Sequence, residues 1–242
     1  MNGVNVDQPS SNQHFGLNTW IKELLEANSI LDGILIYQYC LPPSVQARAS
    51  KAGKFFDVVM DDKKTRSVSF WDAYLYTLLR EKRPPTELFD QVLFHNGIGE
   101  FHAFVSREEL SRSYLSKFLY PPMPEKHFAL ASLALTNDCS LRHIPMIDFA
   151  CNVNPQHTST VRQISERIFD CEFVLFESGN SYHAYGMKLQ NEEERIKFLG
   201  RALLFAPVTD KNYIAHQLQQ GMSSLRISSS QNAIVRVQTM DS

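Results

Sequence analysis

The sequence lacks the marks of several large protein classes. Its 242 residues include only four cysteines, and no two of them form a CxxC pair, which argues against a zinc ribbon and against a disulfide framework. No apolar run is long enough to span a bilayer, and the polar start MNGVNVDQPSSNQ does not have the pattern of a signal peptide. These absences predict a cytoplasmic protein without a membrane partner.

A large charge of either sign is absent as well. The formal net charge is -2, and residues 142–242 hold ten basic and ten acidic side chains. Non-specific nucleic-acid binders usually carry a strong basic excess, so any contact with nucleic acid is expected to be local. The sequence also contains no P-loop, no GxGxxG and no GxSxG nucleophile elbow.

What remains is a globular composition, 43% hydrophobic, that changes character along the chain. Residues 1–17 are rich in Asn, Gln and Ser and are predicted to be a disordered arm. Residues 18–88 are predicted to be a mainly helical extension, in which residues 20–39 begin as a helix and pass into an apolar segment. Residues 89–242 mix strands with helices, which predicts an α+β domain with helices packed on one face of a sheet.

The elements of this domain follow from periodicity and capping. Ser106 followed by Glu109 is a capping-box signature for a helix start. Helices are expected over residues 159–169, 191–205 and 212–219. Strands are expected over residues 128–136, 143–149, 171–176, 181–186, 224–228 and 233–237.

Three of these strands place polar side chains opposite an apolar face. Because strand residues two apart share a face, the alternation sets Asp148, Ser181, His183, Arg226 and Ser228 on such polar faces. Polar residues on one side of an antiparallel sheet are ordinarily just its solvated side. Asp148 differs because its strand is otherwise apolar, where an ionised carboxylate needs a partner or a metal.

Together with Asp210, which precedes the helix expected at 212–219, these side chains suit one kind of chemistry. Carboxylates such as Asp148 and Asp210 hold Mg²⁺ or Mn²⁺, while hydroxyl, imidazole and guanidinium groups bind phosphate oxygens. The set is the inventory of phosphoryl or nucleotidyl transfer, in which positioning and charge neutralisation supply most of the catalysis. His216, six residues after Asp210, could flank the same cleft, although a helical histidine is more often structural.

The order of these residues resembles the archaeo-eukaryotic primase superfamily, the primase-polymerases. The phrases HIPMIDF, SGNSYHAYG and DKNYIAH followed by LRIS are similar to a bacterial branch called primase 1D-like, over roughly residues 90–240. The resemblance implies an RRM-like mixed or antiparallel sheet. It also implies that Asp148 and Asp210 are catalytic metal ligands and that Ser181, His183, Arg226 and Ser228 bind a nucleotide.

One residue departs from the family pattern. A second carboxylate is expected two residues after Asp148, on the same strand face, and this position is Ala150. A methyl group cannot bind a metal, so Asp148 and Asp210 are expected to hold one cation at most. The zinc-binding module of replicative primases is missing too.

The sequence therefore predicts a primase-polymerase-like protein that binds a nucleoside triphosphate or a nucleic-acid end, DNA or RNA, with Mg or Mn. Whether it is a nucleotidyltransferase is left open, since the chemistry is expected to be degenerate. The alternative is a non-catalytic RRM-like module for nucleic acid or protein, in which an exposed Tyr185 would stack on RNA bases. A metal-dependent nuclease is a third reading. The N-terminal helical region is a candidate surface for a protein partner.

Overall fold

The chain divides into two compact units. The computed structural model describes residues 16–40, 54–80, 93, 98–112, 117–118, 126–179, 181–227 and 231–237. The first unit comprises residues 1–38 and 101–242, and the second comprises residues 39–100. In sequence, the second unit is therefore an insertion in the first.

The first unit contains a five-stranded sheet built around one long strand. Its strands are β1 (Leu31–Cys40), β2 (Ile98–Ser106), β3 (Lys126–Thr136), β4 (Leu141–His143) and β8 (Ser224–Arg226). Their order is β2-β1-β3-β4, and β8 pairs with β3 outside this path. β4 and β8 both run antiparallel to β3, which is rich in alanine and leucine and buried over most of its length.

The second sheet of this unit carries most of the polar motif. Its strands are β5 (Met146–Asp148), β6 (Phe173–Ser178), β7 (Ser181–Gly186) and β9 (Gln231–Val237). They lie in the order β5-β7-β6-β9, and every pair is antiparallel. The tight turn from β6 to β7 contains Gly179 at φ +69°, a left-handed conformation that glycine adopts without steric cost.

Five helices are described in the first unit, and short polar side chains begin most of them. They are α1 (Leu17–Ala27), α6 (Arg107–Ser111), α7 (Pro155–Ile168), α8 (Glu192–Leu203) and α9 (Lys211–Gln220). Ser106 with Glu109 forms the capping box expected at α6, and Asn191 with Glu194 forms another at α8. α9 begins at Asp210 and ends at Gly221, which adopts the left-handed conformation of a helix end.

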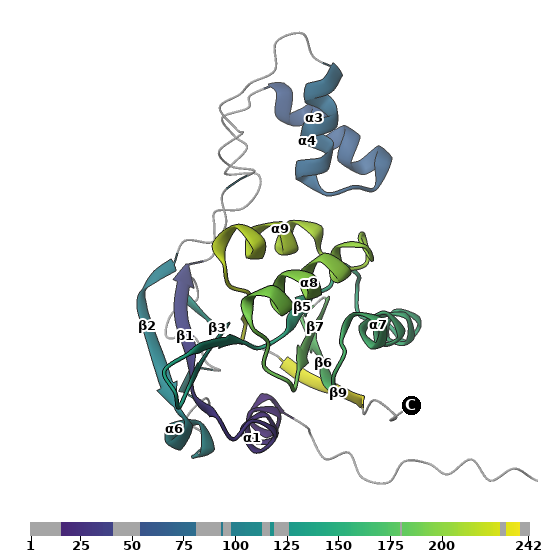
Figure 1. Cartoon of the computed structure of the whole chain (residues 1–242). Coiled ribbons are helices and arrows are strands. Elements are labelled where there is room, and N and C mark those ends of the chain that lie inside the picture. Colours follow the sequence, from purple (N-terminus) through teal and green to yellow (C-terminus); the bar gives the residue numbers. More distant parts are fainter. Residues whose placement is uncertain are drawn as a thin grey trace, which may run out of the picture. The chain divides into compact units, whose positions relative to one another are not determined.

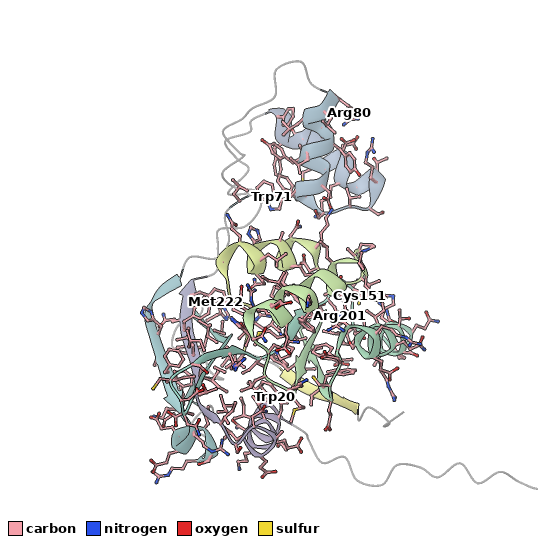
Figure 2. The ribbon with its side chains drawn as sticks, in the orientation of Figure 1. Trp20, Trp71, Arg80, Cys151, Arg201 and Met222 are labelled. Carbon is pink, nitrogen blue, oxygen red and sulfur yellow. The ribbon has the colours of Figure 1, made fainter. Side chains whose placement is uncertain are left out.

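The core of the first unit joins α1 to the second sheet (Figures 1 and 2). Trp20 and Tyr185 are fully buried, and their ring centroids lie 4.7 Å apart. Phe176 packs edge-on against Tyr185, with 5.6 Å between ring centroids. The N-terminal helix α1 therefore covers the face of β7 from which Tyr185 projects.

The second unit is described as a pair of helices, α3 (Lys54–Arg66) and α4 (Phe70–Arg80). Val59, Phe70, Ala73 and Tyr74 form its buried cluster. At the side of this cluster the Asp62 carboxylate accepts a 2.8 Å hydrogen bond from the Thr77 hydroxyl and pairs with Arg80. Of the helices in the described part of the chain, none combines the length and apolarity that a membrane crossing requires.

These elements confirm the α+β class and refine its layout. The described strands form two sheets, where the resemblance implied one RRM-like sheet. The apolar segment after α1 is strand β1, and both elements belong to the first unit although the sequence placed them in the helical extension. Residues 1–15 of the expected arm and the segment 81–92 lie outside the described residues.

If α1 is an integral layer, truncating its buried indole should destabilise the whole first unit. We expect Trp20→Ala to lower the free energy of unfolding by about 3–5 kcal/mol, because it leaves a cavity against Tyr185. Chemical denaturation followed by circular dichroism measures this loss. Leu79→Ala, at a side chain that is 84% exposed, is the matched control and should change stability by no more than about 0.5 kcal/mol. Equal effects of the two changes would contradict the layer.

Candidate functional site

The antiparallel register of β5 and β7 brings two motif residues face to face. Asp148 lies directly opposite His183, and the His183 Nε2 atom is 3.5 Å from the Asp148 Oδ1 atom. Exposure increases along this face of the sheet: the His183 side chain is 7% exposed and that of Asp148 is 30% exposed. The pair therefore sits at the rim of a face whose centre is buried under α1.

Backbone hydrogen bonds bring the start of α9 to the end of β5. The Asp210 N–H donates to the Asp148 carbonyl at 3.0 Å, and the Ala150 N–H donates to the Val208 carbonyl at 2.8 Å. The Asp210 Oδ1 atom accepts from the N–H groups of Asn212 and Tyr213, which makes it the N-cap of the helix. One oxygen of the Asp210 carboxylate thus stabilises the start of α9.

Arg226 comes to the same place from the other sheet. It ends β8, where its neighbours Leu225 and Ile227 are buried and Arg226 itself is partly exposed, as the alternation predicts. Its Nη2 atom lies 3.8 Å from where a Cβ atom on Gly179 would be, so the guanidinium reaches the β6–β7 turn. Arg226 also acts electrostatically on both Asp148 and His183.

Burial and like charge shift the ionisation of the central pair in opposite directions. Burial, with the neighbouring Asp210 carboxylate, raises the pKa of Asp148 to about 8, and the Phe149 N–H and Arg226 oppose the rise. Burial first, and then Arg226, lowers the pKa of His183 to about 3. Both shifts favour the neutral forms of the imidazole and of the Asp148 carboxyl. The site therefore stores less negative charge than its residue types suggest.

The two predicted serines have different outcomes. Ser181, at the start of β7, donates its hydroxyl hydrogen to the Phe149 carbonyl, so a phosphate would have to compete for this donor. Ser228 lies outside the described residues. Five of the six residues predicted for the site are thus described: His183, Asp210 and Arg226 lie around Asp148, and Ser181 is hydrogen-bonded to Phe149, which follows Asp148.

The described carboxylates of the site are few, and both are hard oxygen donors. Asp148 and Asp210 supply two carboxylates, and Ala150 is exposed at the position where a third would be expected. Within the described ranges, no group of three or more His, Cys, Asp or Glu side chains is arranged to hold a metal ion. Mg²⁺ is commonly bound by one or two carboxylates, with water and phosphate oxygens completing its octahedron. The carboxylate pair is compatible with that mode only.

Two neighbours of the site were read differently from the sequence. Tyr185, the candidate for stacking on RNA, is fully buried beneath Trp20, so this part of the alternative reading is wrong. Tyr213 was not singled out, yet its hydroxyl lies 3.4 Å from the Met146 carbonyl. Burial, and then Asp148, raise the pKa of Tyr213. The sequence signal for Tyr213 was its place three residues after Asp210, the residue that caps α9. His216 is partly exposed, and burial lowers its pKa against the opposing effects of a hydrogen bond with Gln219 and of the Asp210 charge.

A buried polar network that the sequence did not reveal fixes α8 against α9. The His143 ring lies 3.1 Å from the Ser132 hydroxyl on one side and 3.1 Å from the Glu192 carboxylate on the other. Arg195 donates two hydrogen bonds to Glu192 and a third to the Gln217 carbonyl in α9. Because Ser132, His143 and Arg195 are buried and are linked through the half-exposed Glu192, we read the network as a support that holds α9, and hence Asp210, in place.

The raised pKa of Asp148 should appear in stability. The folded protein binds a proton there between about pH 4 and pH 8 that the unfolded chain releases, so stability falls as pH rises through this window. Asp148→Asn removes the titration, and its melting temperature relative to the wild type should rise from pH 4.5 to pH 8.5. Asp170→Asn, at a side chain that is 54% exposed, is the control and should run parallel to the wild type. A flat difference for Asp148→Asn would show that its carboxyl is not desolvated.

The geometry can be set beside known proteins. The model of the family described as archaeo-eukaryotic primase 1D-like matches residues 106–239, a segment that includes β5, β7, the start of α9 and β8. Comparisons with curated proteins and with solved structures gave no match. Since the matched segment is more than half of the chain, the protein belongs to the archaeo-eukaryotic primase 1D-like family.

Proposed function

We propose that this primase-polymerase-like protein binds the triphosphate of a nucleotide, or the phosphorylated end of a nucleic acid, together with one divalent cation. The observation that carries the proposal is the convergence of Asp148, His183 and Asp210, with Arg226 acting on the first two. These residues come from β5, β7, the start of α9 and β8, and no single helix or turn would have placed them together.

Mg²⁺ or Mn²⁺ is the cation that the donors favour, because both carboxylates are hard oxygen ligands. Asp148 and Asp210 would hold it. The pKa of Asp148, raised first by burial and then by Asp210, supports this assignment, since a desolvated carboxylate beside a like charge gains from a nearby cation. When bound, the cation would neutralise phosphate charge and orient the phosphate oxygens.

The phosphate oxygens are assigned to Arg226, His183, Ser181 and Ser228. A guanidinium presents a fork of donors that matches phosphate geometry, and the position of Arg226 beside the Gly179 turn leaves its charge near the carboxylate pair. His183 is mostly buried, and its Nδ1 atom has no hydrogen-bond partner within the described structure. We assign His183 to orienting Asp148 as well as to the ligand.

Nucleotidyl transfer itself is proposed to be weak or lost. The reaction joins a hydroxyl oxygen to the α-phosphorus and breaks the bond to the pyrophosphate, and polymerases promote both events with two metal ions. Ala150 removes one of the carboxylates that would hold the second ion. Recognition of a nucleotide or an end would persist without it, because that requires only the cation and the positive groups.

Calorimetric titration with a nucleoside triphosphate tests the binding proposal. Affinity should depend on Mn²⁺, and Arg226→Ala should weaken it by about 1.5–3 kcal/mol through loss of a charge-assisted contact. Arg162→Ala is the matched control, since Arg162 is 51% exposed and pairs only with Glu166 in the described structure, and it should bind like the wild type. Equal affinity with and without metal, or equal loss in both variants, would refute the assignment.

Ala150→Asp tests whether the missing carboxylate explains weak chemistry. The new carboxylate should lower the melting temperature without metal, because it adds a like charge near Asp148 and Asp210, and Mn²⁺ should restore it. Primer extension should rise from a low baseline. Ala27→Asp, at an exposed position of α1, should show no such metal rescue. If Ala150→Asp is destabilised equally with and without Mn²⁺, position 150 does not face the cation.

A further inference from the structure

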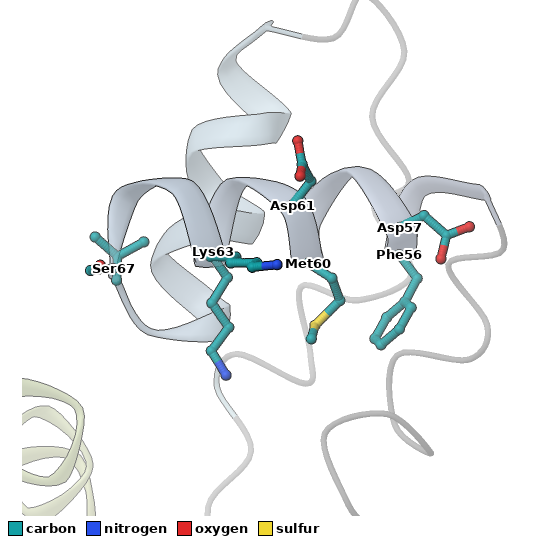
Figure 3. Close-up of a pocket in the computed structure, with 8 residues that line it drawn as sticks. Phe56, Asp57, Met60, Asp61, Lys63 and Ser67 are labelled. Atoms are coloured by element: carbon teal, nitrogen blue, oxygen red, sulfur yellow. The ribbon is translucent and has the colours of Figure 1, made fainter.

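A groove runs along one face of α3 in the second unit, where neither the family match nor the polar site extends. Its volume is about 790 Å³. Figure 3 shows Phe56 and Met60 projecting to one side of the helix, with Asp61 pointing away from them. The residues that line the groove are Phe56, Asp57, Met60, Asp61, Lys63, Lys64, Ser67 and Val68.

This face adjoins the one that α3 packs against α4, and Phe56 lies at the boundary, with its ring centroid 5.9 Å from that of Phe70. Val59 is 1% exposed within the buried cluster, and Asp62, on the same side of the helix, pairs with Thr77 and Arg80 of α4. Met60, by contrast, is 38% exposed. Among the described residues that line the groove, Met60 is therefore the exposed apolar side chain, whereas Phe56 is partly buried against the core of the unit.

The charges on the groove face have a regular arrangement. Asp57 lies in the first turn of α3, and Lys63 and Lys64 lie in the last. At about 100° per residue, positions seven apart return to the same edge of a helix, so Asp57 and Lys64 share one edge. Phe56 and Lys63 share the other edge, and Met60 lies between the two. The helix dipole alone explains why the acidic residue lies in the first turn and the basic residues lie in the last turn. It does not explain why these groups flank one apolar side chain, Met60.

We propose that this face of α3 binds the same face of a second copy of the chain, with the two helices antiparallel. A two-fold axis at Met60 would then place Asp57 opposite the partner's Lys64, and the reverse pair forms by symmetry. Phe56 would meet the aliphatic stem of the partner's Lys63, and the two Met60 side chains would meet at the centre. The face is complementary to itself in both charge and apolar character.

The same balance of charge disfavours a polyanion. Two carboxylates line the groove beside two ammonium groups, and a nucleic acid needs a net positive surface to release its counterions. The contact is also small, because a helix of 13 residues is only about 20 Å long. The association is therefore weak and concentration-dependent, in the micromolar range, and salt weakens it by screening the edge pairs.

The test is a charge exchange on the full chain, with mass measured by sedimentation equilibrium over micromolar concentrations. Asp57→Lys sets lysines at positions 57 and 64 against each other, and Lys64→Glu sets two acidic groups against each other, so each variant alone should be monomeric. Mixed in equal amounts they should form a heterodimer at least as tight as the wild-type dimer. Thr65→Glu, exposed on α3 and outside the groove, is the control and should associate like the wild type.

Several outcomes would overturn the proposal. A wild-type chain that stays monomeric throughout the range does so, as does a dimer that survives both single exchanges. Failure of the mixture to associate, with both variants helical by circular dichroism, also does so. A monomer that binds single-stranded oligonucleotide in the wild type but not as Lys64→Glu would assign the groove to nucleic acid instead.

Discussion

The contact between Asp148 and His183 is the constraint on which the site depends. Because the two residues are directly opposite in an antiparallel pair, the register that buries Ile147 and Ala184 also fixes the distance between a carboxyl and an imidazole. A shift of one strand by one residue would put the two side chains on opposite faces of the sheet. The fold thus holds two groups in a partly dry position where neither prefers its charged form, and a bound ion with phosphate would reverse that preference.

Much of the fold could be read from sequence because it depends on local rules. The capping box at Ser106 and the burial of Leu225 and Ile227 beside a partly exposed Arg226 follow from spacing alone. The strand β1 was harder to recognise, since its apolar run follows α1 after a break of only a few residues. The division of the strands into two sheets depends on long-range pairing, which no local pattern encodes.

The sequence predicted which residues form the site but not which elements cover them. The two-residue period put His183 and Tyr185 on one face, which was taken as a single solvated side. Trp20 of helix α1 covers that face, and the sequence had assigned α1 to a separate helical extension. The same two-residue alternation therefore occurs both at a solvent-exposed edge of the sheet, at Asp148, and at a buried position, Tyr185. Exposure along a strand is decided by what lies above it, and a contact 165 residues away in sequence is beyond the reach of periodicity.

The insertion of the second unit between β1 and β2 has a topological consequence. These strands are neighbours in the first sheet, and Figure 1 shows them running in opposite directions. The chain therefore leaves and re-enters the sheet at adjacent points, about one strand spacing apart. The insertion thus takes the place of a hairpin loop between β1 and β2. Its length adds little to the entropic cost of folding, because the cost of closing a loop grows only slowly with its length. Such a position tolerates inserted modules of different sizes, so a unit at this end of the strands can change without altering the primase-like frame.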